Sequence, residues 1–269
     1  MPASEIAYAK INLALHVRSR REDGYHALET LFAFVDNGDR LTSRPSEIDR
    51  LDVLGEFATG LGVGGNLVAR ALNALPRAGG WHVTLEKNLP VAAGLGGGSA
   101  DAGAVFRMVR DSHGLPEGWQ DKAARLGADV PACVESRACI GRGTGTELEA
   151  VENDLAGTAV LLVNPRVPLS TGEVFRAWDG SDRGALPHGN LRTIAEEGRN
   201  DLEDPAIGLV PEIAEVLDAL NGTDAWLSRM SGSGATCFAL YDDAGARDRA
   251  AARIASFRSQ WWQMSGALR

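Results

Sequence analysis

The chain has 269 residues, with 27 Lys and Arg against 36 Asp and Glu, so its formal net charge is −9. Hydrophobic residues make up 44% and charged residues 23%, which excludes a disordered chain and predicts one large or two medium globular domains. The acidic balance excludes a grip on nucleic acid or anionic lipid through overall charge. Any phosphate must therefore be bound by a local arrangement of residues.

Cysteine usage and the N-terminus bear on the compartment. Cys133, Cys139 and Cys237 are odd in number, lie in apolar stretches and show no CxxC spacing. This pattern predicts free buried thiols rather than disulfides or a zinc site. No run of 18 apolar residues and no basic-then-apolar signal pattern occurs. We therefore expect a cytoplasmic protein with no membrane or nucleic-acid partner.

The first predicted element is a strand over 6–18, where apolar residues alternate with a second face that carries Lys10 and Asn12. This second face is expected to be wet or to line a site. Asp23-Gly24 then separates the strand from a second strand-like run over 25–32, which predicts a hairpin. Tyr25 and His26 are expected near its open polar face.

The remaining predicted elements are helices and strands in a mixed order. A helix is expected from an N-cap at Asn66, and a short helix before Gly127, with Pro131 preventing its resumption. An irregular surface loop is expected over 178–189. Further strands are predicted at 81–87, 159–163, 225–230, 237–241 and 261–264, and further helices after residue 101, at 211–220 and at 243–254. Because no regular βαβ repetition occurs, the sequence predicts an α+β fold with two lobes.

The glycine run from Gly94 to Asp101 is the best candidate for binding phosphate. Its glycines let backbone N–H groups converge on an anion, and the following helix adds its positive N-terminal end. Ser99 and Asp101 are placed to cap that helix, or Ser99 to meet a phosphate or its metal. The run matches neither the Walker pattern nor the G-x-G-x-x-G dinucleotide pattern. A flexible connector or tight packing turn is the alternative.

Two isolated charged residues are also candidates. Lys10 is one of only three lysines among the 27 basic residues, and Asn12 lies about 6–7 Å along the same face of its strand. A lysine on a solvated strand face is the alternative. Asp129, in a turn that Gly127 opens, is as compatible with local hydrogen bonds as with a catalytic base.

Five segments occur in this order along the chain and together give it a family resemblance: Ala9-Lys10-Ile11-Asn12-Leu13, Arg21 through His26, Pro90 through Asp101, Leu126 through Pro131, and Met230 through Thr236. It resembles the galactokinase/homoserine kinase/mevalonate kinase/phosphomevalonate kinase (GHMP) superfamily and, within it, the family of 4-diphosphocytidyl-2-C-methyl-D-erythritol kinases. The resemblance implies an N-terminal lobe like ribosomal protein S5 over 1–153 and a ferredoxin-like C-terminal lobe over 154–269.

The resemblance also implies an ATP-dependent kinase of the non-mevalonate isoprenoid pathway that phosphorylates the 2-hydroxyl of its cytidine diphosphate-linked polyol substrate. Asp129 would be the base and Lys10 would stabilise charge, with Mg²⁺ as cofactor and Ser99 as a candidate ligand. The substrate would contact Asn12, Tyr25, His26, Phe175 and Thr171. ATP would contact Val91, Ala92, Ala93, Gly94, Leu95, Gly96, Gly97, Gly98, Ser99, Ala100, Asp101 and, near the adenine, Asn66.

The same resemblance leaves several points open. Ala100 replaces a second serine common in the family, and Thr146 displaces the family's glutamate by one place. The loop from Ser231 to Thr236 would support the phosphate region, whereas the matching segment Asn200-Asp201-Leu202-Glu203 receives no role. Another GHMP kinase, of homoserine or mevalonate type, and an inactive nucleotide-binding regulator remain alternatives. The chain is expected to be a monomer or a homodimer.

Overall fold

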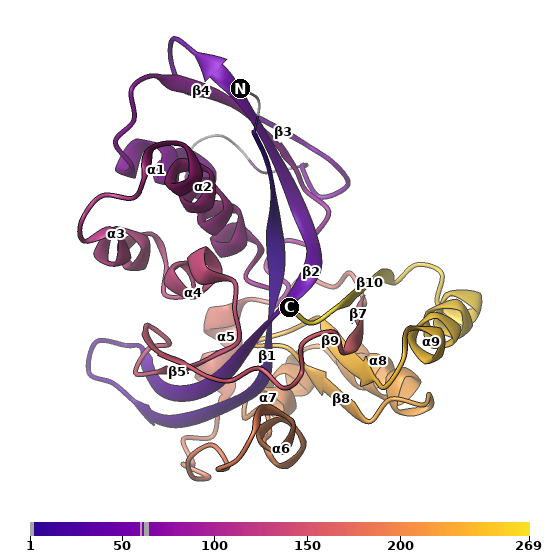
Figure 1. Cartoon of the computed structure of the whole chain (residues 1–269). Helices are drawn as coiled ribbons and strands as arrows, with labels where there is room; N and C mark the ends of the chain where they lie inside the picture. The colour runs from indigo at the N-terminus through magenta and orange to yellow at the C-terminus, as the bar shows by residue number, and fades with distance from the viewer. Residues whose placement is uncertain (1–2, 60, 62–64) are drawn as a thin grey trace. The chain divides into compact units, whose positions relative to one another are not determined.

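The computed structural model describes residues 3–59, 61 and 65–269, and these fall into two compact units (Figure 1). The two units are not consecutive halves of the chain, because the long strands β1 (Ala3–Arg20) and β2 (His26–Ser46) contribute residues to both. The predicted division at residues 153 and 154 stays a prediction. Unit 1 takes its residues from Met1–Lys10, Asn37–Val91 and Gly96–Ser136, and unit 2 from Ile11–Asp36, Ala92–Leu95 and Arg137–Arg269.

Unit 1 combines a sheet with four helices, which lie on one side of its strands (Figure 1). The second half of β2 pairs antiparallel with β4 (Gly80–Glu86), and β4 pairs parallel with β3 (Arg50–Leu54). The helices are α1 (Leu67–Ala74), α2 (Gly97–His113), α3 (Trp119–Leu126) and α4 (Val130–Glu135). Helices α2 and α4 approach closely at Gly103, where a Cβ would lie 2.5 Å from the carbonyl oxygen of Cys133.

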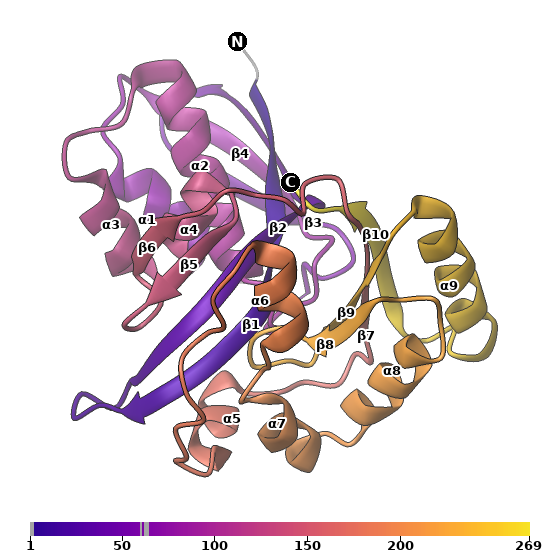
Figure 2. The same cartoon turned by 60° about the horizontal axis from the view of Figure 1, so that its bottom comes forward.

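Unit 2 contains a four-stranded antiparallel sheet in the order β10-β7-β9-β8. Numbered along the chain this order is 4-1-3-2, with helices between the first and second and between the third and fourth strands, which confirms the predicted ferredoxin-like arrangement. Helices α8 and α9 pack against its strands (Figure 2). The strands are β7 (Ala159–Asn164), β8 (Leu227–Met230), β9 (Cys237–Tyr241) and β10 (Trp262–Ala267).

The rest of unit 2 consists of short elements. The first half of β2 pairs with β5 (Cys139–Arg142), which pairs with β6 (Glu147–Ala150). One apolar core, which includes Leu161, Ile213 and Tyr241, lies between the β7–β10 sheet and its helices. The helices are α5 (Thr171–Ala177), α6 (Leu191–Glu197), α7 (Glu203–Leu209), α8 (Glu212–Asn221) and α9 (Ala244–Phe257).

Most elements expected from the sequence are present, including the hairpin of β1 and β2 and the Asn66 cap of α1, whose side chain accepts a hydrogen bond from Val68 N at 2.9 Å. One expectation was wrong. Pro131 does not prevent the helix from resuming, because it lies in the first turn of α4, where its missing N–H is not needed. Of the two outcomes expected for the second face of β1, the wet face is excluded, because Lys10 and Asn12 are 4% and 2% exposed, and a face that lines a site remains.

The three cysteines are free and buried, as expected. None of the helices in the described part of the chain has the length and apolar character needed to cross a membrane.

Candidate active site

In unit 1, Lys10 of β1 meets Asp129, the residue before α4. Lys10 Nζ lies 3.3 Å from Asp129 Oδ2, and the two side chains are 5% and 33% exposed. A solvated lysine is therefore excluded. Asp129 is the N-cap of α4, but its side chain makes no capping hydrogen bond to the helix. Its carboxylate is therefore not used to cap α4. The result is an accessible carboxylate beside a buried ammonium group.

The N-terminal end of α2 lies beside this pair. Its N-cap is Gly96, in the left-handed region with φ 61°, and a Cβ there would lie 3.0 Å from Lys10 Cε and 3.7 Å from Asp129 Oδ2. No side chain caps α2, which corrects the expectation that Ser99 or Asp101 does so, and its first turn carries no acid. A helix end of this kind attracts anions through its N–H groups and dipole. Ser99 is half-buried in the first turn, close to Gly127.

Asp101, predicted to contact ATP, belongs instead to a buried charged cluster in unit 1. Lys87 Nζ donates to Asp101 Oδ2 at 2.9 Å and also to Asp39, which accepts from the backbone N–H groups of Asn88 and Leu89. Burial raises the pKa of Asp101 to about 8, the nearby Asp39 adding to the effect and Lys87 opposing it. Asp101 Oδ1 has no hydrogen-bond partner. The cluster is thus electrically neutral when Asp101 holds a proton.

Asp101→Asn should change how stability depends on pH. The pKa is higher in the folded than in the unfolded state, so between about pH 4 and pH 8 only the folded chain keeps this proton. The contribution of Asp101 to the free energy of unfolding therefore falls as pH rises, by up to about 1.4 kcal/mol per pH unit. Urea unfolding of both proteins from pH 5 to pH 8 should show the unsubstituted chain losing stability relative to the variant. Equal pH dependence of the two proteins over this range would mean that Asp101 is ionised when folded.

Ala92 to Leu95 belong to unit 2, where they contact the loop from Ser231 to Thr236. Ser231 Oγ donates to Gly94 O at 2.8 Å, and Thr236 N donates to Ala93 O at 3.2 Å. Gly94 has φ 76°, and a side chain there would collide with the carbonyl oxygen of Ser231. These contacts agree with the expectation that the Ser231 loop supports the glycine run, and they exclude a flexible connector for this part of it.

Three further predicted contact residues have defined partners. Asn12 donates from its backbone to Ser231 Oγ at 3.2 Å and from Nδ2 to Thr30 Oγ1 at 2.7 Å, both in unit 2. Thr171 Oγ1 lies 2.9 Å from Ser233 Oγ. In unit 1, Asn66 caps α1. Their contacts with ligands stay predictions.

The aromatic residues predicted to hold a nucleobase gather in unit 2. The His26 ring lies 4.8 Å from that of Phe175 and meets the edge of Trp178 at 5.6 Å, whereas Tyr25 is 65% exposed. Burial, with a smaller effect of the Arg20 charge, lowers the pKa of His26, so its ring is neutral at pH 7. His26 Nε2 and Trp178 Nε1 are buried without hydrogen-bond partners. Trp178 was not predicted, since it begins an irregular loop with no pattern to mark it.

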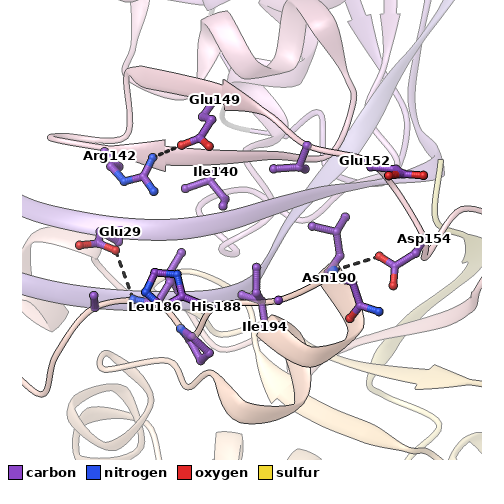
Figure 3. Close-up of a pocket in the computed structure, with 15 residues that line it drawn as sticks. Glu29, Ile140, Arg142, Glu149, Glu152, Asp154, Leu186, His188, Asn190 and Ile194 are labelled. Carbon is purple, nitrogen blue, oxygen red and sulfur yellow. Dashed lines mark hydrogen bonds and ion pairs between the residues drawn. The ribbon is translucent and has the colours of Figure 1, made fainter.

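Unit 2 also has a cavity of about 610 Å³ that none of the predicted site residues lines. Figure 3 shows that three acidic residues of its lining, Glu29, Glu149 and Asp154, have partners in the protein. Glu29 accepts from Leu186 N, Asp154 accepts from Leu191 N, and Glu149 pairs with Arg142. Across the described residues, no group of three or more His, Cys, Asp or Glu side chains could hold a metal.

Comparison with known proteins gives matches along the whole chain. Residues 66–137 match the family model of the GHMP kinases N terminal domain, and residues 183–259 match that of the GHMP kinases C terminal. The 4-diphosphocytidyl-2-C-methyl-D-erythritol kinase of Novosphingobium aromaticivorans is 67% identical, covering 100% of this chain and 94% of the relative. That of Erythrobacter litoralis is 65% identical, covering 98% and 99%.

Solved structures agree. A crystal structure of 4-(cytidine 5'-diphospho)-2C-methyl-D-erythritol kinase is 34% identical, with a TM-score of 0.84 and 99% of each chain covered. Homoserine kinase from Cytophaga hutchinsonii shares the fold at 18% identity, with a TM-score of 0.65 and 97% and 95% covered. The chain therefore belongs to the 4-diphosphocytidyl-2-C-methyl-D-erythritol kinase family of the GHMP kinases.

Proposed function

We propose that this chain, an ATP-dependent phosphotransferase by its family, transfers the γ-phosphoryl group of ATP to the 2-hydroxyl of 4-diphosphocytidyl-2-C-methyl-D-erythritol. The observation that carries the chemistry is the arrangement of Lys10, Asp129 and Gly96 in unit 1. It combines an accessible base, a buried cation and an anion-attracting helix end. These are the groups that phosphoryl transfer needs, because its catalysis consists mainly of alignment and charge stabilisation.

Asp129 acts as the general base in this proposal. The acceptor O–H gives its proton to Asp129 Oδ2 while its oxygen forms a bond to the γ-phosphorus and the bond from that phosphorus to the bridging oxygen of ADP breaks. Lys10, 3.3 Å from Asp129 Oδ2, keeps that carboxylate in place and offsets negative charge near the transferred group. The N–H groups at the start of α2 stabilise the phosphate oxygens.

Mg²⁺ fits this arrangement as a metal that arrives with ATP. In such sites the phosphates and water supply most of its ligands, so a protein cage is not required. Ser99, half-buried in the first turn of α2, is the side chain that we propose as a ligand. When bound, the metal would neutralise charge on the phosphates.

The cytidine end of the substrate is assigned to residues of unit 2. His26 offers a buried ring nitrogen that has no partner in the protein, and Tyr25 offers an exposed aromatic face for stacking. A base stacked on an aromatic ring gains roughly 1–3 kcal/mol in single-stranded nucleic-acid complexes. Phe175 forms a second aromatic surface next to His26, and Asn12 and Thr171 are the proposed polar contacts.

Acceptor specificity is tested directly by incubating the chain with ATP, Mg²⁺ and each of three alcohols. We expect ADP formation with 4-diphosphocytidyl-2-C-methyl-D-erythritol at a kcat/KM at least 10³-fold above that with homoserine or mevalonate, because a site built for polar groups rejects acceptors that leave those groups unpaired. Phosphorus NMR of the product locates the new phosphate. Preferential transfer to homoserine or mevalonate would reject the acceptor.

An inactive nucleotide-binding regulator is the alternative from another class. The intact pair of Lys10 and Asp129 disfavours it, since a regulator has no use for a base beside the phosphate-binding helix end. We place the reaction in the cytoplasm, on the basis of the free thiols, with a monomer or a homodimer as the working form.

A further inference from the structure

The segment Asn200–Glu203 matches the family but has no role in the reaction described above. In unit 2, Asn200 donates from Nδ2 to two carbonyl oxygens, those of Met230 and Gly232, both at 2.8 Å. Its Oδ1 accepts from Leu202 N at 3.0 Å, and the residue is 7% exposed. Both N–H donors of this buried amide are thus used to hold Met230 and Gly232, at the start of the Ser231 loop, while its oxygen forms a local turn with Leu202.

Glu203 holds Met230, the last residue of β8 and the one directly before the same loop, through a third bond. Its Oε2 accepts from Met230 N at 2.8 Å. Burial raises the pKa of Glu203, and the bond from Met230 N opposes that shift. Burying this carboxylate costs free energy, which the hydrogen bond from Met230 N and the nearby charge of Arg229 offset, so the carboxylate is held beside that N–H.

The segment is itself fixed to β1. Leu15 N donates to Arg199 O at 2.8 Å, and Asp201 N donates to Leu15 O at 2.9 Å. Asp201 Oδ2 accepts from Val17 N at 2.7 Å. The amide of Asn200 and the carboxylate of Glu203 are therefore presented from a rigid base rather than from a mobile loop.

On its other side, the Ser231 loop contacts residues proposed to bind both substrates. Ser231 Oγ accepts from Asn12 N and donates to Gly94 O, and a Cβ at Gly232 would lie 3.0 Å from Asn12 Oδ1. A shift of this loop would therefore displace the proposed phosphate-binding glycine Gly94 and the proposed acceptor contact Asn12 together.

We infer that Asn200 and Glu203 are positioning residues, which set the place of the Ser231 loop and through it the places of Gly94 and Asn12. This inference rests on the proposed function for the role of Asn12 as an acceptor contact. The effect on Gly94 is tested independently, by measuring ATP binding. Misplacement by about 1 Å can cost on the order of 10²-fold in rate, so even a small movement of the loop is measurable.

The first test is Asn200→Asp, which keeps the size of the side chain but removes both donors and sets a carboxylate against two carbonyl oxygens. We expect kcat/KM to fall by about 10–100-fold, through a higher KM for ATP and a lower kcat, and the dissociation constant of a non-hydrolysable ATP analogue to rise at least fivefold. Folding is checked by near-UV circular dichroism. A folded variant with the kinetic constants and analogue affinity of the unsubstituted chain would overturn the inference.

Two substitutions of Glu203, which disturb the structure less, test the inference if Asn200→Asp fails to fold. Glu203→Ala removes the acceptor for Met230 N, whereas Glu203→Gln keeps a carbonyl oxygen there and should restore the analogue affinity. Asp204→Ala, at an exposed neighbour in the same helix, is the matched control and should leave it unchanged. Equal affinities for Glu203→Ala and the control would overturn the inference. If the unsubstituted chain transferred no phosphate to the cytidine acceptor, the proposed function alone would be rejected. The inference about Asn200 and Glu203 would still be tested, because the affinities of the variants for the ATP analogue can be compared without turnover.

Discussion

Replacing Asp129 with Ala is expected to lower kcat by about 10²–10⁴-fold while ATP binds with nearly unchanged affinity. The carboxylate is the group placed to take the acceptor proton, it makes no capping hydrogen bond in α4, and it is 33% exposed. Its loss should therefore remove a catalytic step without unfolding the unit. Single-turnover transfer to the cytidine acceptor gives the rate, and titration calorimetry with an ATP analogue gives the affinity.

Two variants sharpen this test. Asp129→Asn keeps the shape of the side chain but cannot accept the proton as a carboxylate does, so its rate should also fall by at least 10²-fold. Asp121→Ala removes an exposed carboxylate from the first turn of α3 and should behave as the unsubstituted chain does. If Asp129→Ala turned over at the normal rate, Asp129 would have no part in the mechanism.

The local parts of the fold could be predicted because their causes are local. The alternation over residues 6–18 predicts a strand, the side chain of Asn66 caps a helix, and the glycine run opens α2. Helices α5, α6 and α7 were not predicted, since seven residues give too little periodicity to recognise.

Long-range contacts explain what the sequence could not predict. Strand β2 continues far beyond residue 32, through polar residues, because Gly38 lets it approach Ala7 of β1 too closely for any side chain. Asp39, Lys87 and Asp101 form one buried cluster although they lie far apart in the chain. No spacing or composition marks such a meeting, so the sequence could not predict that Asp101 is buried beside Lys87 and Asp39.

The candidate site, like the fold, was predicted only in part from the sequence. The residue chemistry alone left Lys10 and Asp129 with ordinary alternatives, and only the family resemblance joined them. The structure then supplies the physical reasons, namely the burial of Lys10, the uncapped α2 and the 3.3 Å ion pair. The contacts of Asn200 and Glu203 could not be predicted, because their partners are backbone groups of a distant segment that no side-chain pattern reveals.

Lys10→Met is expected to lower kcat by about 10²–10³-fold, the range found when one charge-stabilising group is removed from a preorganised site. Methionine fills a comparable volume in this buried position, so the fold should be kept. Lys10→Arg keeps the charge but should recover little activity. A Cβ at Gly96 would already lie 3.0 Å from Lys10 Cε, and the larger planar guanidinium group cannot take the place of a compact ammonium.

The double variant Lys10→Met/Asp129→Ala decides whether the two residues act as one unit. If Lys10 works by holding the base and stabilising the charge that the base creates, its loss should cost little once Asp129 is gone. The double variant should then be slower than Asp129→Ala by less than about fivefold. Fully additive losses would mean that Lys10 acts on the phosphates independently of Asp129, and the 3.3 Å ion pair would then be no part of the catalytic step.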